Sequence, residues 1–160
     1  MSNDSGETRD SIGEIFAADH RGFLLLGREV EVAFAAGALE SAKVVWKTLS
    51  TSLAMHLYAE EQFMVPALGR AHPRVAHAVL AEHRLIRDRV VEIEASVVRG
   101  ESPSVLVMSF VFELDAHARH EEKIFCAWRD AWLDEDERAL LAAYRDSARS
   151  ASSAASSSST

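Results

Sequence analysis

Apolar residues recur at helical spacing along most of the chain, and glycine or proline stands near each break between the repeats. No stretch alternates apolar and polar residues in the way that a half-buried strand would. The pattern predicts long helices at about residues 11–35, 39–68, 73–99 and 104–133. Because helices of this length joined by short turns lie antiparallel to their neighbours, we expect an all-α, up-down-up-down four-helix bundle.

Both ends of the chain depart from this pattern. Residues 1–10 are polar, which predicts a flexible N-terminal lead. The acidic group at 134–137 suits the positive start of a short C-terminal fifth helix at about residues 135–147. The last stretch, 149–160, is almost wholly serine and alanine, which predicts a disordered tail. The bundle domain is therefore expected to span residues 11–148.

The second predicted helix carries a histidine and a carboxylate on its apolar face. His56 and Glu60 stand four residues apart, so at about 100° per residue their side chains point the same way. Leu53 and Met64 lie on the same face. Burying a histidine and a carboxylate without partners is costly, so either hydrogen bonds or a metal ion must compensate them.

The other predicted helices place similar residues on their core faces. His117 and Glu121 repeat the His-x-x-x-Glu spacing in the fourth helix, while the first and third helices each carry a single histidine on the stripe. If the chain folds back at each turn, residues at equal distances before and after the turn lie side by side. By this rule, all of these residues lie at the same level along the bundle. The candidate metal ligands are His20, His56, Glu60, His83, His117 and Glu121. Such a mixed nitrogen and oxygen set suits iron, manganese or zinc better than calcium or magnesium, and the carboxylates could bridge two ions.

This arrangement resembles the hemerythrin-like, or HHE cation-binding, domain family. Each ligand carboxylate is followed by a second glutamate and by apolar residues, in AEEQFMVPAL and HEEKIFCAW, and the resemblance covers about residues 11–133. The resemblance implies that the six candidates ligate a non-haem di-iron centre with two iron ions as the cofactor.

The sequence departs from the oxygen carriers that it resembles. Those carriers have a second histidine one turn from the histidine that matches His83, whereas Val79 and Arg87 stand at the flanking positions here. They also use a His-x-x-x-x-Asp spacing in the last helix, where this chain offers Glu121. One protein ligand fewer leaves an extra position for water, oxygen or another small ligand, which favours reactive or sensing chemistry over reversible oxygen carriage.

Three functions fit these residues. The first is a di-iron protein that binds or senses oxygen or a related small molecule. The second is a di-iron oxidoreductase that acts on peroxide, nitric oxide or ferrous iron. The third is a metal-free structural or interaction bundle, in which the buried polar residues only fix the register of the helices.

Charge and composition narrow the partners and the compartment. The net charge of −8 and the lack of a Lys/Arg cluster argue against nucleic acid and against anionic membrane surfaces. No apolar run approaches the roughly 20 residues that cross a bilayer, and the polar N-terminus shows no secretory signal. A single cysteine, Cys126, fits a reducing compartment. We therefore expect a cytoplasmic protein whose partner is oxygen or a similar small ligand.

Several residues beside the six have simpler interpretations. Glu61 and Glu122 point away from the ligand faces. They suit either surface positions or contacts to the outer side of a ligating side chain. Glu82 is interpreted as a solvated residue. His120 is either an ordinary histidine at the edge of the core or a residue that orients a ligand from outside. Gly27 allows two interpretations, close helix packing or a pocket that admits a gas.

Overall fold

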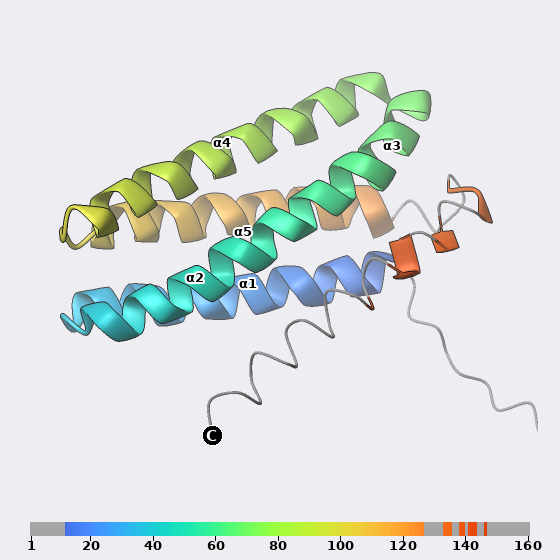
Figure 1. The fold of residues 1–160 in the computed structure, drawn as a ribbon. Helices are drawn as coiled ribbons and strands as arrows, with labels where there is room; N and C mark the ends of the chain where they lie inside the picture. Colours follow the sequence, from blue (N-terminus) through green and yellow to red (C-terminus); the bar gives the residue numbers. More distant parts are fainter. Residues whose placement is uncertain (1–11, 127–132, 136–137, 140, 144–145, 147–160) are drawn as a thin grey trace, which may run out of the picture.

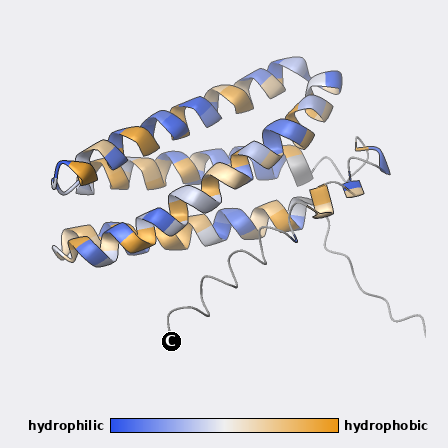
Figure 2. Cartoon of the chain, in the orientation of Figure 1, coloured by the Kyte–Doolittle hydropathy of each residue, from blue (hydrophilic) through white to orange (hydrophobic). Residues whose placement is uncertain are grey.

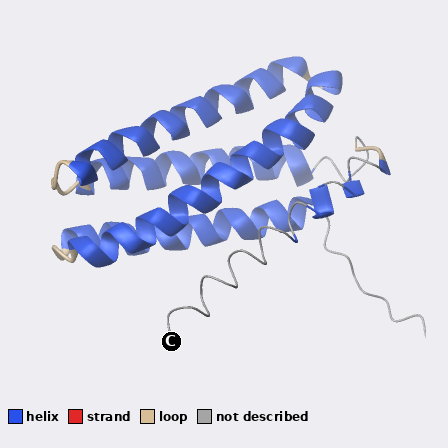
Figure 3. Cartoon of the chain, in the orientation of Figure 1, coloured by secondary structure: helices blue, strands red, loops and turns tan. Residues whose placement is uncertain are grey.

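The described part of the chain consists of helices joined by short turns. The computed structural model describes residues 12–126, 133–135, 138–139, 141–143 and 146. Within them lie α1 (Ile12–Ala35), α2 (Leu39–Ala59), the π-helix η1 (Glu60–Met64), α3 (Val65–Ala71), α4 (Pro73–Val98) and α5 (Ser104–Cys126). No strand occurs among these residues, so the all-α prediction is confirmed for them (Figures 1 and 3).

Two glycine turns reverse the chain as the sequence predicts. Gly37 and Gly100 have φ values of 73° and 74°, a left-handed conformation that costs glycine little. After α1, the amide of Gly37 donates to the carbonyl of Phe34 and that of Ala38 to Ala33, the double closure of a Schellman motif. The same pair of bonds follows α4 around Gly100. These turns allow α1 to pack on α2 and α4 to pack on α5.

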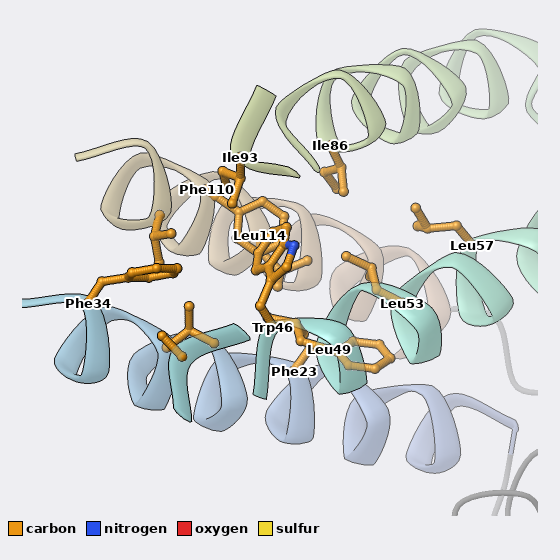
Figure 4. Packing of buried hydrophobic residues seen from close by; sticks show 13 residues of the cluster. Phe23, Phe34, Trp46, Leu49, Leu53, Leu57, Ile86, Ile93, Phe110 and Leu114 are labelled. Atoms are coloured by element: carbon orange, nitrogen blue, oxygen red, sulfur yellow. The ribbon is translucent and has the colours of Figure 1, made fainter. Parts of the chain in front are cut away.

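The helices lie side by side as a bundle. Helix α1 contacts both α2 and α5, and α4 contacts both α5 and α3 (Figure 1). Apolar and polar residues are interspersed along every helix (Figure 2), and buried apolar side chains meet between the helices (Figure 4). The larger core cluster is formed by Phe23, Val30, Phe34, Ala42, Trp46, Leu49, Leu53, Leu57, Ile86, Ile93, Val107, Phe110 and Leu114.

A second apolar cluster lies at the other end of the bundle. Its buried members are Phe16, Ala59, Met64, Val65, Ala67, Leu68, Ala76, Val79, Leu133 and Leu141. Along α1, His20 stands between Phe16 of this cluster and Phe23 of the larger one. Along α4, His83 stands between Val79 and Ile86 in the same way. The polar level predicted from the sequence therefore separates two apolar cores.

The predicted helix at 39–68 is longer than expected and contains a π turn. We expected it to end at about Leu68, ahead of Gly69, which was wrong, because α3 continues through Gly69 to Ala71. The π turn η1 ends at Met64, two residues before Pro66. Proline lacks an amide hydrogen, and its ring clashes with the carbonyl four residues earlier, so a widened turn lets the chain pass it without a break.

Gly27 lies where α1 and α5 approach closely. A Cβ atom added at this residue would stand 2.8 Å from Cγ2 of Val111 and 3.9 Å from Leu49. The side chain of Val111 branches at Cβ and has little freedom to move away. Gly27 therefore permits close packing, and the structure gives no support to a gas pocket at this residue.

Some predictions concern residues outside the described part. These are the N-terminal lead at 1–10, the last part of the fourth helix at 127–132 and the tail at 149–160. The described residues of the predicted fifth helix are helical, but its bounds stay a prediction because it also contains residues outside that part. Among the described helices, none is both long and apolar enough to cross a membrane.

Candidate metal centre

The structure brings all six candidate ligands together in the interior. They come from five elements: His20 from α1, His56 from α2, Glu60 from η1, His83 from α4, and His117 with Glu121 from α5. None is more than 6% exposed, and Glu60, His83 and Glu121 are fully buried. A buried group of four imidazoles and two carboxylates is rare without a partner that offsets the cost of its desolvation.

One set of donor atoms comes from His20, His56, Glu60 and Glu121, and these atoms all lie within 4.8 Å of one another. Nε2 of His20 stands 3.0 Å from Nε2 of His56 and 3.3 Å from Oε2 of Glu121. Nε2 of His56 stands 3.1 Å from Oε1 of Glu60. The imidazoles thus present their Nε2 atoms to the carboxylates.

A second set comes from Glu60, His83, His117 and Glu121, again within 4.8 Å of one another. Nε2 of His83 stands 3.4 Å from Oε2 of Glu60 and 3.3 Å from Oε1 of Glu121. Nε2 of His117 stands 3.3 Å from Oε2 of Glu121. We call the first set the His20–His56 position and this set the His83–His117 position.

The two positions share their carboxylates. Oε1 of Glu60 faces His56 of one position, and Oε2 of the same residue faces His83 of the other. Glu121 likewise lies against His20 of one position and against His83 and His117 of the other. This arrangement would suit two ions that share both carboxylates, with two imidazoles as further ligands of each ion.

Unpaired polar atoms test whether a metal fits these residues better than a hydrogen-bonded network. In the described chain, the buried side-chain atoms without a hydrogen-bond partner include both oxygens of Glu60, Oε2 of Glu121 and Nε2 of His117. Neighbouring imidazole nitrogens are close enough for ion pairs, but their directions do not suit hydrogen bonds to these atoms. Leaving such atoms unpaired inside a protein is costly, so the donor set fits metal ions rather than a self-contained network.

Three carboxylates hold the imidazoles from outside. Nδ1 of His83 donates to Oε1 of Glu61 at 2.9 Å, and Nδ1 of His117 donates to Oε2 of Glu82 at 2.9 Å. Nδ1 of His56 lies 3.3 Å from Oδ2 of Asp19. A carboxylate can only accept here, so each contact fixes the proton on Nδ1 and leaves Nε2 free for a metal.

These contacts correct the interpretation of Glu82 and decide between the two interpretations of His120. Glu82 is not simply a solvated residue, because it accepts from His117 and, at 2.7 Å through Oε1, from Nδ1 of His120. His120 is therefore part of the network around the ligands rather than an ordinary edge histidine. In the sequence, the one indication of a role for Glu82 is its place next to His83. The contacts of Glu82 form only because α5 packs against that side of α4.

The comparison with protein families agrees with this geometry. Residues 11–129 match the model of the hemerythrin HHE cation binding domain, and this span contains all six candidate ligands. The chain belongs to the hemerythrin family. No curated protein and no solved structure matches it.

The charges of the hemerythrin site depend on one another. Burial by itself lowers the pKa of His56, but the charge of Glu60 and the hydrogen bond to Asp19 outweigh it and raise that pKa to about 10. Burial also lowers the pKa of His83, but the hydrogen bond to Glu121 and the close carboxylate of Glu60 raise it to about 10. Burial raises the pKa of Glu60, yet His56 and His83 hold it well below its usual value. The metal-free hemerythrin domain therefore holds protons on imidazoles where it would otherwise hold metal.

The stability of the metal-free hemerythrin domain is expected to fall as the pH rises from about 6.5 to 10. His56 and His83 titrate near 6.5 when unfolded and near 10 when folded, so their contribution is complete below 6.5 and lost through this window. The lowered pKa of Glu60 gives a contribution that is present above 4.5 and is lost as the pH falls through its folded value. Urea unfolding of metal-free protein across this range measures the trend, and a stability that rises towards pH 10 would contradict it.

Proposed function

We propose that this hemerythrin-family chain forms an up-down-up-down four-helix bundle that holds two iron ions in a carboxylate-bridged, non-haem centre. We further propose that it binds or senses oxygen or a related small molecule there. The observation that carries the proposal is the sharing of Glu60 and Glu121 by two buried four-donor sets. Manganese or zinc would use the same donors and are the alternatives to iron.

Each residue has a defined part in this proposal. His20 and His56 would hold one ion, His83 and His117 the other, and the two carboxylates would lie between the ions and offset their charge. Iron, when bound, supplies a change of oxidation state between ferrous and ferric. Each position offers two imidazoles and two carboxylates, and a set of two histidines with a carboxylate is the type that leaves coordination positions open in non-haem iron proteins.

Aromatic side chains cover the His20–His56 position. The rings of Phe16 and Phe23 pack edge-on against His56, with centroids 4.9 and 5.0 Å from that of the imidazole. Both phenylalanines are buried. They keep bulk water from the imidazole and restrict its orientation, so a small uncharged ligand such as oxygen suits the site better than a large or charged one.

The open coordination positions also support a second candidate, an oxidoreductase that acts on peroxide, nitric oxide or ferrous iron. Both functions need the same ions and the same six residues. They differ in outcome, because a binding protein returns to its starting state when the small ligand is removed, whereas an enzyme consumes successive additions of its substrate.

Metal content and ligand response test the proposal. Metal-free protein is loaded anaerobically with ferrous iron and desalted, and its iron is measured by inductively coupled plasma mass spectrometry. We expect about two irons per chain and an optical change on exposure to oxygen, since the proposed centre holds two ions and leaves positions open. Retention of the optical change after oxygen removal, with repeated consumption of added peroxide, would favour the enzyme.

Matched variants make the test specific. Replacing His56 and His117 together by alanine removes one imidazole from each position and should abolish iron retention. His77→Ala on the exposed face of α4 is the control and should retain the full iron content. A folded wild-type protein that retains no iron would refute the proposal.

A further inference from the structure

The carboxylates that hold the imidazoles follow a regular order around the bundle. Asp19 of α1 contacts His56 of α2. Glu61, in the π turn that follows α2, contacts His83 of α4, and Glu82 of α4 contacts His117 of α5. Each carboxylate is adjacent in sequence to one candidate ligand and supports the imidazole of the next helix. A contact from α5 to α1 would complete this order.

That last contact is missing within the described chain. Nδ1 of His20 is buried and has no hydrogen-bond partner among the described residues, although His20 is only 1% exposed. The other imidazole of this position is also weakly held, since Asp19 lies at 3.3 Å and its side chain is 48% exposed. Water and salt screen the charge of such an exposed carboxylate, which weakens its interaction with the imidazole.

Both imidazoles of the other position are held tightly. The Nδ1 atoms of His83 and His117 each lie 2.9 Å from a carboxylate oxygen that is more shielded than Asp19, with Glu61 at 23% and Glu82 at 33% exposed. Each of these carboxylates has a second donor that fixes it in place. For Glu82 this donor is His120, at 2.7 Å.

The second donor to Glu61 is Arg87. Its two terminal nitrogens donate to the two oxygens of Glu61, at 2.6 and 3.0 Å. This two-point contact sets the orientation of the carboxylate as well as its place. Glu60 and Glu61 follow one another in the π turn, and they contact His83 at Nε2 and Nδ1 respectively. Arg87, Glu61 and Glu60 therefore hold the His83 ring from both sides before any metal arrives.

We propose that the two metal positions differ in affinity, so that the His83–His117 position fills first and the His20–His56 position holds the more readily exchanged ion. The inference rests on the proposed two-metal centre. An outer carboxylate raises the basicity of a ligating imidazole and fixes its orientation, and its loss typically costs about 10- to 100-fold in metal affinity. One position has two firm contacts of this kind and the other has one weak contact, so we expect at least about a 10-fold difference between the two steps.

Anaerobic calorimetric titration of metal-free protein with Co²⁺ tests the order of filling. The wild type should bind two ions in separate steps. Replacing Glu61 and Glu82 together by glutamine preserves their size but removes the charge, and should weaken the first step by about 10-fold or more. Asp19→Asn should leave the first step unchanged. Circular dichroism of each variant establishes that it is folded.

Histidine variants assign the steps to positions. Replacing His20 and His56 by alanine should leave one tightly bound ion, whereas replacing His83 and His117 should leave binding only at the weaker affinity. The control is Glu113→Gln, which breaks the ion pair with Arg89 between α4 and α5 without touching a candidate ligand. This variant should bind as the wild type does.

The outcomes separate this inference from the proposed function. Two ions of equal affinity, or a first step that ignores the change at Glu61 and Glu82, would overturn the inference and leave the two-metal centre intact. A tighter ion at the His20–His56 position would do the same. No bound cobalt at any concentration would overturn both.

Discussion

Loading the metal-free protein with ferrous iron is expected to raise its melting temperature by about 8–16 °C. A ligand that binds only the folded state, at a free concentration of about 1,000 times its Kd, stabilises that state by about 4 kcal/mol. In a domain of this size each kcal/mol moves the melting temperature by about 2–4 °C. The unpaired oxygens of Glu60 and Glu121 gain partners when metal binds, which is the physical source of the gain.

Anaerobic thermal unfolding followed by circular dichroism measures this shift. Removal of the iron with a chelator should reverse it, and the His56→Ala/His117→Ala variant should melt at the same temperature with and without iron. A wild-type melting temperature that does not respond to iron would indicate that the buried polar residues have a structural role alone.

Replacing Glu60 by glutamine is expected to cost the protein both ions, so that retained iron falls from about two per chain to near none. Its two oxygens face different positions, since Oε1 lies 3.1 Å from Nε2 of His56 and Oε2 lies 3.4 Å from Nε2 of His83. A glutamine of the same size offers one weak oxygen donor and no charge, so it cannot bridge two ions. The iron content of the desalted protein is the measurement.

His20→Ala gives the matched comparison. His20 belongs to one position only, so this variant should retain about one iron per chain where Glu60→Gln retains none. The Glu113→Gln protein serves as the control for loss of a carboxylate and should keep both ions. If Glu60→Gln kept two ions, Glu60 would not be a shared ligand.

The positions of the six site residues could be predicted because two simple rules determine them. Helical spacing places His56 and Glu60 on one face, and the Gly37 turn sets the level at which His20 meets them. Both rules act within one helix or across one turn. Apolar clusters pack on both sides of this level, so the polar residues between them are buried in the interior.

Among the outer contacts, that of Glu61 was one of two interpretations from the sequence, whereas that of Glu82 could not be predicted in the same way. Glu82 is about 100° from His83 around α4, a direction that is solvent for a lone helix and is occupied by His117 and His120 of α5 in the fold. Such contacts depend on the rotation of two helices against each other, which a single sequence does not specify. The π turn did leave a signal in Pro66, since a proline inside a helical pattern requires some local adjustment.

The apolar cluster beyond the metal site bears on where this domain ends. The family match stops at residue 129, yet Leu133 and Leu141 are buried in the same cluster as Phe16. Phe16 in turn packs against the imidazole of His56. A chain cut at the limit of the family match would therefore lose two buried members of the cluster whose Phe16 covers His56, because the packed core extends beyond the matched span.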